Sequence, residues 1–582
     1  MSTISTKSSP KKRSQQTEKA AVLAKKAEVR IASKKEQPEI SQLVWRGSAA
    51  AILVVGGVFR LYDLSLVPFH HDEGVNGNFL VTLVRNGVYH YDPQNYHGPT
   101  LYYFSAIIPW LARFLGGRAF GDMHGLTTFN VRFVTAVFGI ATIWLALLLR
   151  RRLGTIGALS AAGLIAISPG AVYLSRYFIH EMLFVFFNFG IIVAALYYYD
   201  TRRSVYLILA AISAALMVAT KETWIINGPV LLIALLVTAG YFYLRERFGR
   251  KRKADGPSVR EKLGEEFNRF GSPAAIATVA LFALTAFLLV NVLFYSSFFT
   301  NYPKGVHDAL QTLKLWSRRT HEHEHPWWQY LSWLWQEEAI VLILGTIGAA
   351  IAVWRANNRT AVFLSLWSFG LLTAYSFAGV SIAHLFTDQT YKTPWITLNF
   401  IVPLAVTAGY ALEVLYRWLR EYQQPRLIVA LLALIVVVSG YQMYSLNFVH
   451  YDDDQYPYVY AHTRRETLVM LDEIDRITKR LGTSYDTGIA LVSPDYWPLP
   501  WYFRDYKRVG YYTQIVPTTE PVIIGSMAQA DQLKSTYSDR YQQIDSHQLN
   551  DPRVDPNHSP EGSFELRPGV DLVLYLKKDV PR

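Results

Sequence analysis

Long apolar runs dominate residues 44–446, whereas both ends of the chain are polar. An apolar run of about 18 or more residues is long enough to cross a bilayer core of about 30 Å as a helix. A soluble protein of this size has no need of so many such runs. The pattern therefore predicts a polytopic α-helical membrane protein.

We expect about 11 transmembrane helices from the lengths of these runs. The expected spans are 44–62, 127–149, 155–174, 181–199, 204–220, 223–244, 274–298, 337–354, 360–378, 393–416 and 427–446. Between the first two lies a long segment, 63–126, whose runs 75–86 and 101–115 have helical apolar patterns. We interpret these two runs as helices along the membrane interface.

The distribution of basic residues predicts the orientation in the membrane. Cytoplasmic loops carry an excess of Lys and Arg, and a cytoplasmic N-terminus places every strongly basic turn on that side. These turns are 150–152, 202–203, 245–253, 355–359 and 417–426. The opposite loops, richer in His, Asp and Glu, are 63–126, 175–180, 299–336 and 379–392. We therefore expect a multi-pass protein of the plasma membrane, and so of the cell envelope, with residues 447–582 outside.

Two polar segments flank the predicted membrane domain of residues 44–446. Residues 1–43 are basic and Ser-rich without an apolar core, which predicts a disordered cytoplasmic tail rather than a cleavable signal peptide. Residues 447–582 have an acidic balance of charge. An amphipathic helical pattern covers 468–481, and short strand-like runs follow. This segment is predicted to be a small extracytoplasmic α/β domain. The strand-like runs are 488–492, 522–524 and 572–576.

Composition excludes some chemistry. The chain has no cysteine, which rules out disulfides, thiolate catalysis and Cys-based zinc sites. The net charge is +12, but the basic residues gather in the N-terminal tail and the short loops. The positive-inside rule explains this distribution, so we expect no nucleic-acid partner.

The first outer loop carries the strongest candidate for catalysis. His71, Asp72 and Glu73 come shortly after the first span, and Tyr96 and His97 follow in the same loop. Two carboxylates at a membrane surface suit general-base chemistry on a hydroxyl group. The alternative interpretation is ordinary solvated loop charge.

Further charged residues stand at the outer ends of later spans. Arg176, His180 and Glu181 surround the turn before the fourth span, and Lys221 and Glu222 separate two apolar runs. An Arg fork suits a phosphate, and charges at membrane depth tend to line cavities. A structural ion pair between Arg176 and Glu181 is one alternative, and snorkelling of Lys221 to the interface is another.

The loop before the eighth span contains His321, His323 and His325. Alternate residues share one face of an extended segment, and imidazoles suit zinc and similar ions. These three residues are therefore a candidate site for a divalent metal, although the spacing is equally compatible with a role near the acceptor or a lipid head group. Lys392, where the chain enters the tenth span, is placed to contact an anionic head group.

Taken together, these motifs resemble the GT-C superfamily of membrane glycosyltransferases. The most similar groups are the protein O-mannosyltransferases and the aminoarabinose and RgtA-to-D-like transferases. The pair Asp72-Glu73, the stretch 175–177 followed by Glu181, and Lys221 carry the resemblance, as do the runs 326–331 and 392–394. These families more often carry Asp where this chain has Glu181.

Over residues 44–520 the chain is also similar to a family of flippase-activity-associated proteins of S-layer glycoprotein glycosylation. The strings 71–74, 96–99 and 496–502 carry this similarity. The C-terminal segment lacks the sugar-binding modules of the mannosyltransferases. The resemblance thus leaves the acceptor open.

The resemblance implies an inverting sugar transfer from a polyprenyl-phosphate donor to a glycan or protein acceptor, with no required cofactor. Asp72 would deprotonate the acceptor hydroxyl, and Glu73 and Glu181 would position the acceptor or orient basic residues. The residues implied for the donor phosphate are Arg176, Lys221 and Lys392, and those implied for substrate are His71, Tyr96, His97, His180 and Glu222. Two alternatives stay open: a flippase or its accessory factor, and a non-catalytic assembly subunit.

Overall fold

The computed structural model describes residues 40–95, 97–248, 272–316, 323–379, 389–555 and 559–580. The chain divides into two units, Met1–Ala51 and Ile52–Arg582. The described part of the first unit holds the first half of helix α2 (Gln42–Leu61).

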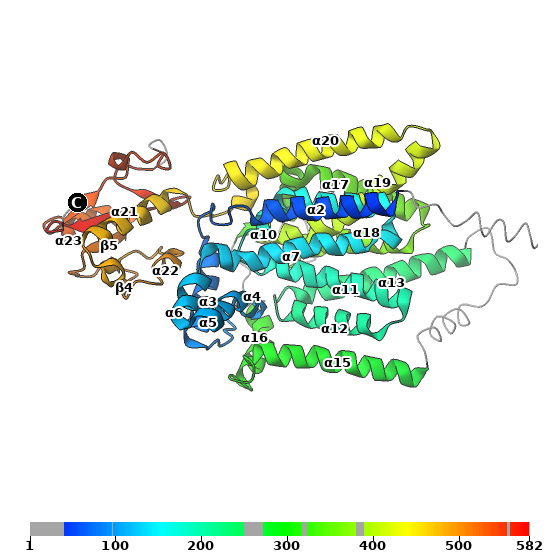
Figure 1. The fold of residues 1–582 in the computed structure, drawn as a ribbon, viewed down its shortest axis with the longest axis horizontal. Coiled ribbons are helices and arrows are strands. Elements are labelled where there is room, and N and C mark those ends of the chain that lie inside the picture. Colours follow the sequence, from blue (N-terminus) through cyan, green and yellow to red (C-terminus); the bar gives the residue numbers. More distant parts are fainter. Residues whose placement is uncertain are drawn as a thin grey trace, which may run out of the picture. The chain divides into compact units, whose positions relative to one another are not determined.

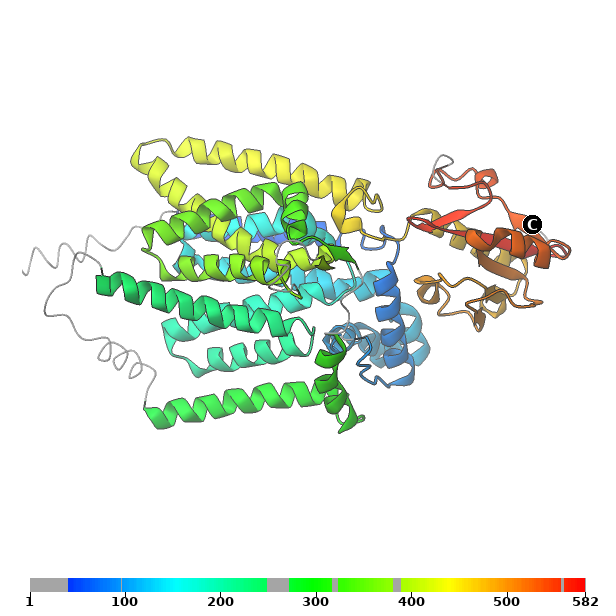
Figure 2. The same cartoon turned by 180° about the vertical axis from the view of Figure 1, so that it is seen from behind.

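Long helices run side by side through this unit (Figures 1 and 2). Pairs with extensive contact are α17 with α19, α9 with α19, and α11 with α12. Each of the expected spans coincides with helix. The helices are α7 (Thr128–Leu148), α9 (Thr155–Ile167), α10 (Pro169–Ser175), α11 (Glu181–Thr201), α12 (Ser204–Val218), α13 (Trp224–Phe248), α15 (Pro273–Tyr295), α17 (Gln329–Arg355), α18 (Arg359–Ser376), α19 (Leu398–Glu421) and α20 (Pro425–Tyr444).

Within the described residues, 8 helices are long and apolar enough to cross a membrane. The pair α9 and α10 adds a ninth if the two form one span, and α12 is a shorter apolar helix. The expectation of a multi-pass helical membrane protein is therefore confirmed. Of the other expected spans, α12 is apolar but only 15 residues long, and α18, with 18 residues, is not among the eight.

The third expected span, 155–174, is not one straight helix. A bend of 60° separates α9 from α10, where Ser168 caps the new helix and Pro169 begins it. The bend frees carbonyl groups at the end of α9. Arg60 of α2 donates to the carbonyls of Ile165 and Ala166, at 2.9 and 3.1 Å. Broken helices persist at membrane depth where such partners satisfy the backbone.

Close backbone packing joins α9, α17 and α19. A Cβ atom on Gly409 of α19 would overlap the carbonyl oxygen of Gly157 in α9. A Cβ atom on Gly348 of α17 would overlap the carbonyl oxygen of Thr407 in the same way. Small residues let helices approach closely in a membrane, where dispersion rather than water exclusion drives their association.

Short elements gather at one end of the helices, on the side where the strands of the C-terminal segment lie (Figures 1 and 2). The segment 63–126 folds into helices, as its apolar pattern predicts, and two strands, β1 and β2, pair antiparallel. The elements at this end are α3 (His71–Asn86), α4 (Thr100–Ser105), α5 (Ile107–Gly116), α6 (Arg118–Gly125), α16 (Lys304–Trp316), β1 (Glu324–His325), β2 (Thr390–Tyr391) and η2 (Pro394–Thr397). The basic turn 150–152 instead forms α8 (Arg150–Leu153).

The C-terminal segment contains a mixed sheet of six strands in the order β4-β3-β5-β8-β6, with β7 also paired to β8. The strands are β3 (Gly488–Leu491), β4 (Arg508–Tyr511), β5 (Val522–Ser526), β6 (Tyr541–Ile544), β7 (Phe564–Arg567) and β8 (Val570–Lys577). Its helices are α21 (Glu466–Arg480), α22 (Leu499–Tyr502) and α23 (Ala530–Tyr537), and its 3-10 turns are η4 (Pro457–Val459), η5 (Ser484–Asp486), η6 (Met527–Gln529) and η7 (His547–Leu549). A π-helical turn, η3 (Ser445–Val449), continues α20 into this segment.

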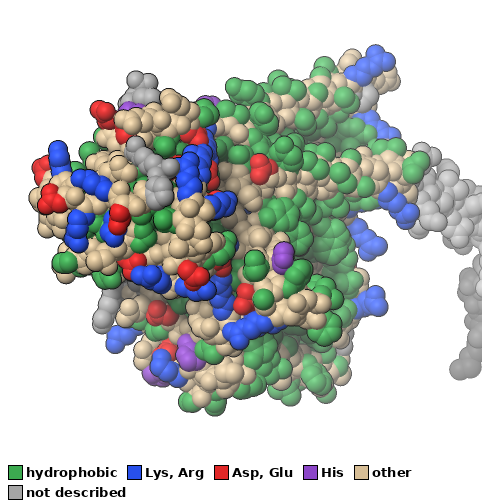
Figure 3. All heavy atoms as spheres, turned by 60° about the vertical axis from the view of Figure 1, so that its left-hand side comes forward, with side chains coloured by type: hydrophobic (Ala, Val, Ile, Leu, Met, Phe, Trp, Pro, Cys, Tyr) green, Lys and Arg blue, Asp and Glu red, His purple; other side chains and the backbone are tan. Residues whose placement is uncertain are grey.

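Apolar side chains of the sheet and of α21 form a common core. Ile474 and Ile477 of α21 pack against Ile489, Ile524 and other buried strand residues. Helix α21 and strands β3, β5 and β8 coincide with the elements expected from the sequence. The sequence pattern did not indicate β4, β6 and β7, which are four-residue strands without a clear alternation of apolar and polar residues. Charged side chains cover this segment, while apolar side chains cover the long helices (Figure 3). This contrast fits an aqueous domain joined to a membrane domain.

Gly409→Ala should destabilise the protein by about 1–3 kcal/mol, because the added methyl group overlaps the backbone of α9. Gly163 of α9 is the matched control, since a Cβ atom there meets nothing within 4 Å. Gly163→Ala should be neutral or stabilising by up to about 1 kcal/mol. Thermal unfolding in lipid nanodiscs measures both, and equal midpoints for the two variants would contradict the close contact.

Candidate active site

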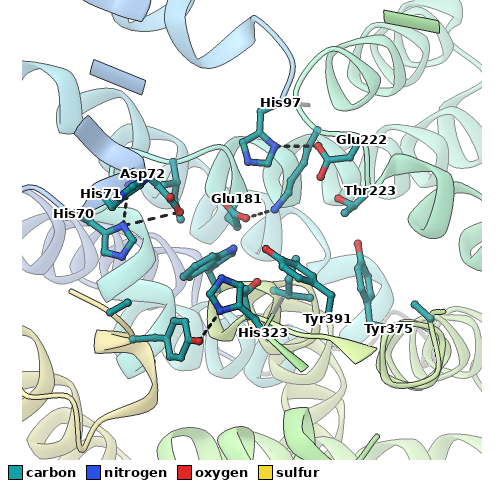
Figure 4. Close-up of a pocket in the computed structure, with 18 of the residues that line it drawn as sticks. His70, His71, Asp72, His97, Glu181, Glu222, Thr223, His323, Tyr375 and Tyr391 are labelled. Carbon is teal, nitrogen blue, oxygen red and sulfur yellow. Dashed lines mark hydrogen bonds and ion pairs between the residues drawn. The ribbon is translucent and has the colours of Figure 1, made fainter. Parts of the chain in front are cut away.

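A cavity of about 1050 Å³ opens where the loops at this end of the helices meet. Its lining comes from α3, the loop before α4, the starts of α11 and α13, the β1–β2 pair and the C-terminal segment. Figure 4 shows Glu181 near the centre, with Asp72 to its left, His97 and Glu222 above and His323 and Tyr391 below. Segments far apart in the sequence thus share one chamber, lined by both charged and apolar side chains.

Asp72 stands in the first turn of α3. The helix begins with a capping box, in which the His70 Nδ1 atom accepts from the Asp72 backbone N–H at 3.0 Å. Asp72 itself lines the cavity, and its side chain is 44% exposed. The described residues offer it no lysine or arginine partner; the His70 Nδ1 atom, at 4.0 Å, is the one ion-pair contact. This carboxylate is therefore accessible from the cavity, and within the described residues no Lys or Arg side chain holds it.

Glu73 points away from the cavity into a buried ion pair with Arg132 of α7. Its two carboxylate oxygens lie 2.7 and 2.6 Å from the Arg132 guanidinium. They also accept the backbone N–H groups of His70 and Phe178, at 3.0 and 2.7 Å. The sequence left two roles open for Glu73, namely positioning the acceptor or orienting a basic residue. Its buried position does not support contact with the acceptor. Orientation of a basic residue is supported, although the residue is Arg132.

Glu181 and Glu222 are both paired at the cavity. Glu181 forms an ion pair with Lys221, and His97 Nδ1 lies 3.0 Å from Glu222 Oε2. Gly98 brings His97 there, because its N–H donates to the carbonyl of Thr220 at 2.9 Å. Burial by itself raises the pKa of Glu222, but the nearby His97 and Lys221 outweigh it and lower the pKa below its usual value.

Two other predicted residues serve the surrounding structure. The Arg176 guanidinium donates to the carbonyls of Phe59, Tyr62 and Asp63, at 3.1, 2.5 and 2.8 Å, and so satisfies the C-terminal end of α2. Arg176 is not among the described residues that line the cavity, and this position does not support its expected role in binding the donor phosphate. His180 is buried with Nε2 3.0 Å from the carbonyl oxygen of Gly98, and burial lowers its pKa well below the usual value.

Lys392 also lies behind the cavity wall, where its ammonium donates to the carbonyl of His325 at 3.2 Å and to the Thr390 hydroxyl at 2.5 Å. His323 faces the cavity and contacts the Tyr460 hydroxyl at 2.6 Å. Within the described ranges no three His, Cys, Asp or Glu residues are arranged to hold a metal ion. Two predicted site residues, Tyr96 and His321, lie outside the described residues.

The cavity is also lined by residues that were not among the candidates expected from the sequence. Arg567, at the end of β7, joins Lys221 as the second Lys or Arg side chain among the described lining residues. Tyr375, Tyr391 and Trp395 add aromatic surface. No local motif marks Arg567, because it is separated from Asp72 by almost the whole chain. His71 lines the cavity beside Asp72, as expected.

Comparison with known proteins gives a family match over part of the chain and a shared fold over most of it. The family model for dolichyl-phosphate-mannose-protein mannosyltransferases matches residues 107–248. ArnT from Cupriavidus metallidurans bound to undecaprenyl phosphate is 14% identical, with a TM-score of 0.53 over 92% of this chain and 98% of that one. The apo form of ArnT gives 13% identity and a TM-score of 0.52 over 91% of this chain and 97% of that one. No curated protein sequence matches the chain.

The oligosaccharyltransferase of Archaeoglobus fulgidus, tethered to an acceptor peptide, is 16% identical with a TM-score of 0.48. The match covers 81% of this chain, which spans 64% of that longer protein. The fold shared with ArnT and the family match together confirm the expected relationship to the GT-C superfamily of membrane glycosyltransferases, and with it the expected class of enzyme.

Glu73→Gln should lower the free energy of unfolding by about 3–5 kcal/mol, because it leaves the buried Arg132 charge without its carboxylate. Asp72→Asn is the matched control and should change stability by less than about 0.5 kcal/mol, since its carboxylate is half-exposed. Thermal unfolding of both variants in nanodiscs measures the difference. A loss of stability in Asp72→Asn as large as that in Glu73→Gln would contradict these assignments.

The stability of the protein should rise with pH above about 8 because of Lys392. Burial lowers the pKa of its ammonium from 10.5 to about 8. Between these two values the unfolded chain binds more protons than the folded protein, so the free energy of unfolding increases with pH. Lys392→Met should flatten this rise, whereas Lys534→Met, at an exposed position, should preserve it. Unfolding midpoints across this pH interval test the assignment, which an unchanged slope in Lys392→Met would contradict.

Proposed function

We propose that this chain, a membrane protein of the GT-C type, transfers a sugar from a polyprenyl-phosphate donor to an acceptor hydroxyl at the outer membrane face. Asp72 takes the proton of the acceptor hydroxyl. The oxygen attacks the anomeric carbon on the face opposite the phosphate, and the bond to the phosphate breaks with inversion. The lipid phosphate leaves with the electron pair.

The accessibility of Asp72 is the observation that carries this proposal. A general base must reach the proton that it removes, and a carboxylate held in a salt bridge is a weaker base. Glu181 is paired with Lys221 and Glu222 with His97, whereas Asp72 faces the cavity without a cationic lysine or arginine partner among the described residues. These pairs support Asp72 as the base and leave Glu181 and Glu222 as residues that orient Lys221 and His97.

Lys221 and Arg567 support binding of the donor phosphate. A leaving phosphate needs fixed cations that act on its charge as the bond breaks. Lys221 enters the cavity from the turn between α12 and α13, and Arg567 enters it from the C-terminal sheet. Of the three cations that the resemblance implied, Lys221 keeps this role in the proposal. His71, His97 and His323 add neutral or cationic donors around them.

The position of the cavity supports the proposed orientation. It opens among the outer loops expected from the charge pattern, on the side of the sheet-containing segment. The strongly basic turn 150–152 begins at the opposite end of α7. We therefore place the N-terminus in the cytoplasm and the C-terminal segment outside, where a lipid-linked donor presents its sugar.

Asp72→Asn should reduce sugar transfer or release by about 10²–10⁴-fold, because it removes the general base while leaving the fold intact. The protein in nanodiscs is supplied with a panel of polyprenyl-phosphate sugars, and released or transferred sugar is measured. Asp92→Asn, an exposed carboxylate of the same outer loop, is the control and should retain activity.

Full activity of Asp72→Asn would refute the assignment of the base. Binding of lipid-linked sugars without turnover by the unmodified chain, across the panel and with added acceptors, would instead favour the accessory role in lipid-linked glycan transport.

A further inference from the structure

The string 496–502 has no part in the transfer chemistry proposed above, yet it lies beside the cavity. We propose that Tyr496, Trp497 and Tyr511 form a row of aromatic rings that binds a saccharide acceptor and leads it to Asp72. The inference rests on the proposed function and names its acceptor class: a glycan rather than a polypeptide.

The rings follow one another outward from the cavity. His71, which precedes Asp72 on α3, lies 6.1 Å from the Trp497 ring. The Trp497 and Tyr496 rings are 5.8 Å apart, and the Tyr496 and Tyr511 rings are 5.4 Å apart. Trp497 and Tyr496 are half-buried, and Tyr511 is 38% exposed. The row is therefore continuous and open to a ligand at its outer end.

A second cavity of about 260 Å³ lies at the far end of the row. Tyr511 lines it together with Trp501 and Tyr506, and Asn78 and Lys507 bring polar groups to the same space. The row thus connects the catalytic cavity, through His71, to a small site with aromatic faces and hydrogen-bond donors. We assign this small site to a sugar residue of the acceptor further from the reacting hydroxyl.

The row is fixed to the helix that carries Asp72. A Cβ atom on Gly74 of α3 would lie 2.7 Å from the Cβ atom of Pro498, so this glycine lets the 496–502 segment pack directly on α3. Arg567 forms an ion pair with Asp495 and donates to the carbonyl oxygen of Trp497 at 3.4 Å. The distance from Trp497 to the catalytic cavity is thereby set by both packing and polar contacts.

The chemistry of these surfaces favours a saccharide. A sugar ring presents an apolar C–H face and a rim of hydroxyl groups, and aromatic rings with a few polar neighbours match both features. Successive rings bind successive sugar residues of an extended glycan without requiring one particular sequence. An extended peptide would depend chiefly on main-chain pairing at the exposed edge of β4, which needs no aromatic row.

The test measures binding apart from turnover, in the full-length Asp72→Asn protein in nanodiscs. The probes are di- and trisaccharides of mannose, glucose, galactose and N-acetylglucosamine, together with Ser/Thr-containing peptides, followed by saturation-transfer NMR. We expect at least one saccharide series to bind. Tyr511→Ala and Trp497→Ala should each weaken that binding by about three- to tenfold, and Trp497→Phe should restore most of it.

Tyr512→Ala is the matched control. Tyr512 follows Tyr511 directly and is 41% exposed, but it lies just beyond β4 with its ring over Gly510 and is not among the described residues that line the second cavity. It should leave saccharide binding unchanged. If Trp497→Ala does not fold, Tyr511→Ala on the edge strand carries the test, because that side chain packs less deeply.

Sugar release from the donor, measured in otherwise unmodified protein, separates this inference from the proposed function. Donor turnover without saccharide binding, or saccharide binding that survives Tyr511→Ala, would overturn the aromatic row and leave the transferase intact. Peptide binding in place of saccharide binding would also overturn it. Saccharide binding that depends on the rings, without turnover of any donor, would support the row while the proposed transfer fails.

Discussion

The buried ion pair between Glu73 and Arg132 fixes the arrangement on which the site depends. Arg132 also donates to the carbonyls of Leu64, Val67 and Pro68, while Glu73 accepts the N–H of Phe178. One pair thus joins the end of the first outer turn, the start of α3, helix α7 and the segment before α11. Because a buried pair gains little net free energy after desolvation, its main effect is to specify where these segments lie.

Buried arginines have a common structural role in this membrane domain. Arg60 satisfies carbonyls freed by the bend between α9 and α10, and Arg176 satisfies those at the end of α2. With no water in the bilayer core, each break in a helix needs a donor of this kind. A charged residue in such a sequence therefore marks a backbone irregularity as readily as it marks a ligand.

The cavity is completed by the C-terminal segment. Arg567 and Tyr460 line it beside residues of the loops that join the helices, and the Tyr502 hydroxyl accepts the backbone N–H of Phe69 at 2.8 Å. Trp501 stacks on Phe69 with ring centroids 4.5 Å apart. The C-terminal segment is thus part of the chamber wall rather than an appendage, which is why the proposed aromatic row for the acceptor lies on it.

The sequence by itself determined the membrane class, the positions of the helices and the place of Asp72, because apolar length and local charge set these features. It also indicated His97, Glu181, Lys221 and Glu222, which the fold brings to one cavity. Only the tertiary structure separated Asp72 from its neighbour Glu73, since adjacent helical residues face different directions. It alone revealed Arg567 and the bend in the third span, because these depend on contacts between segments distant in the chain.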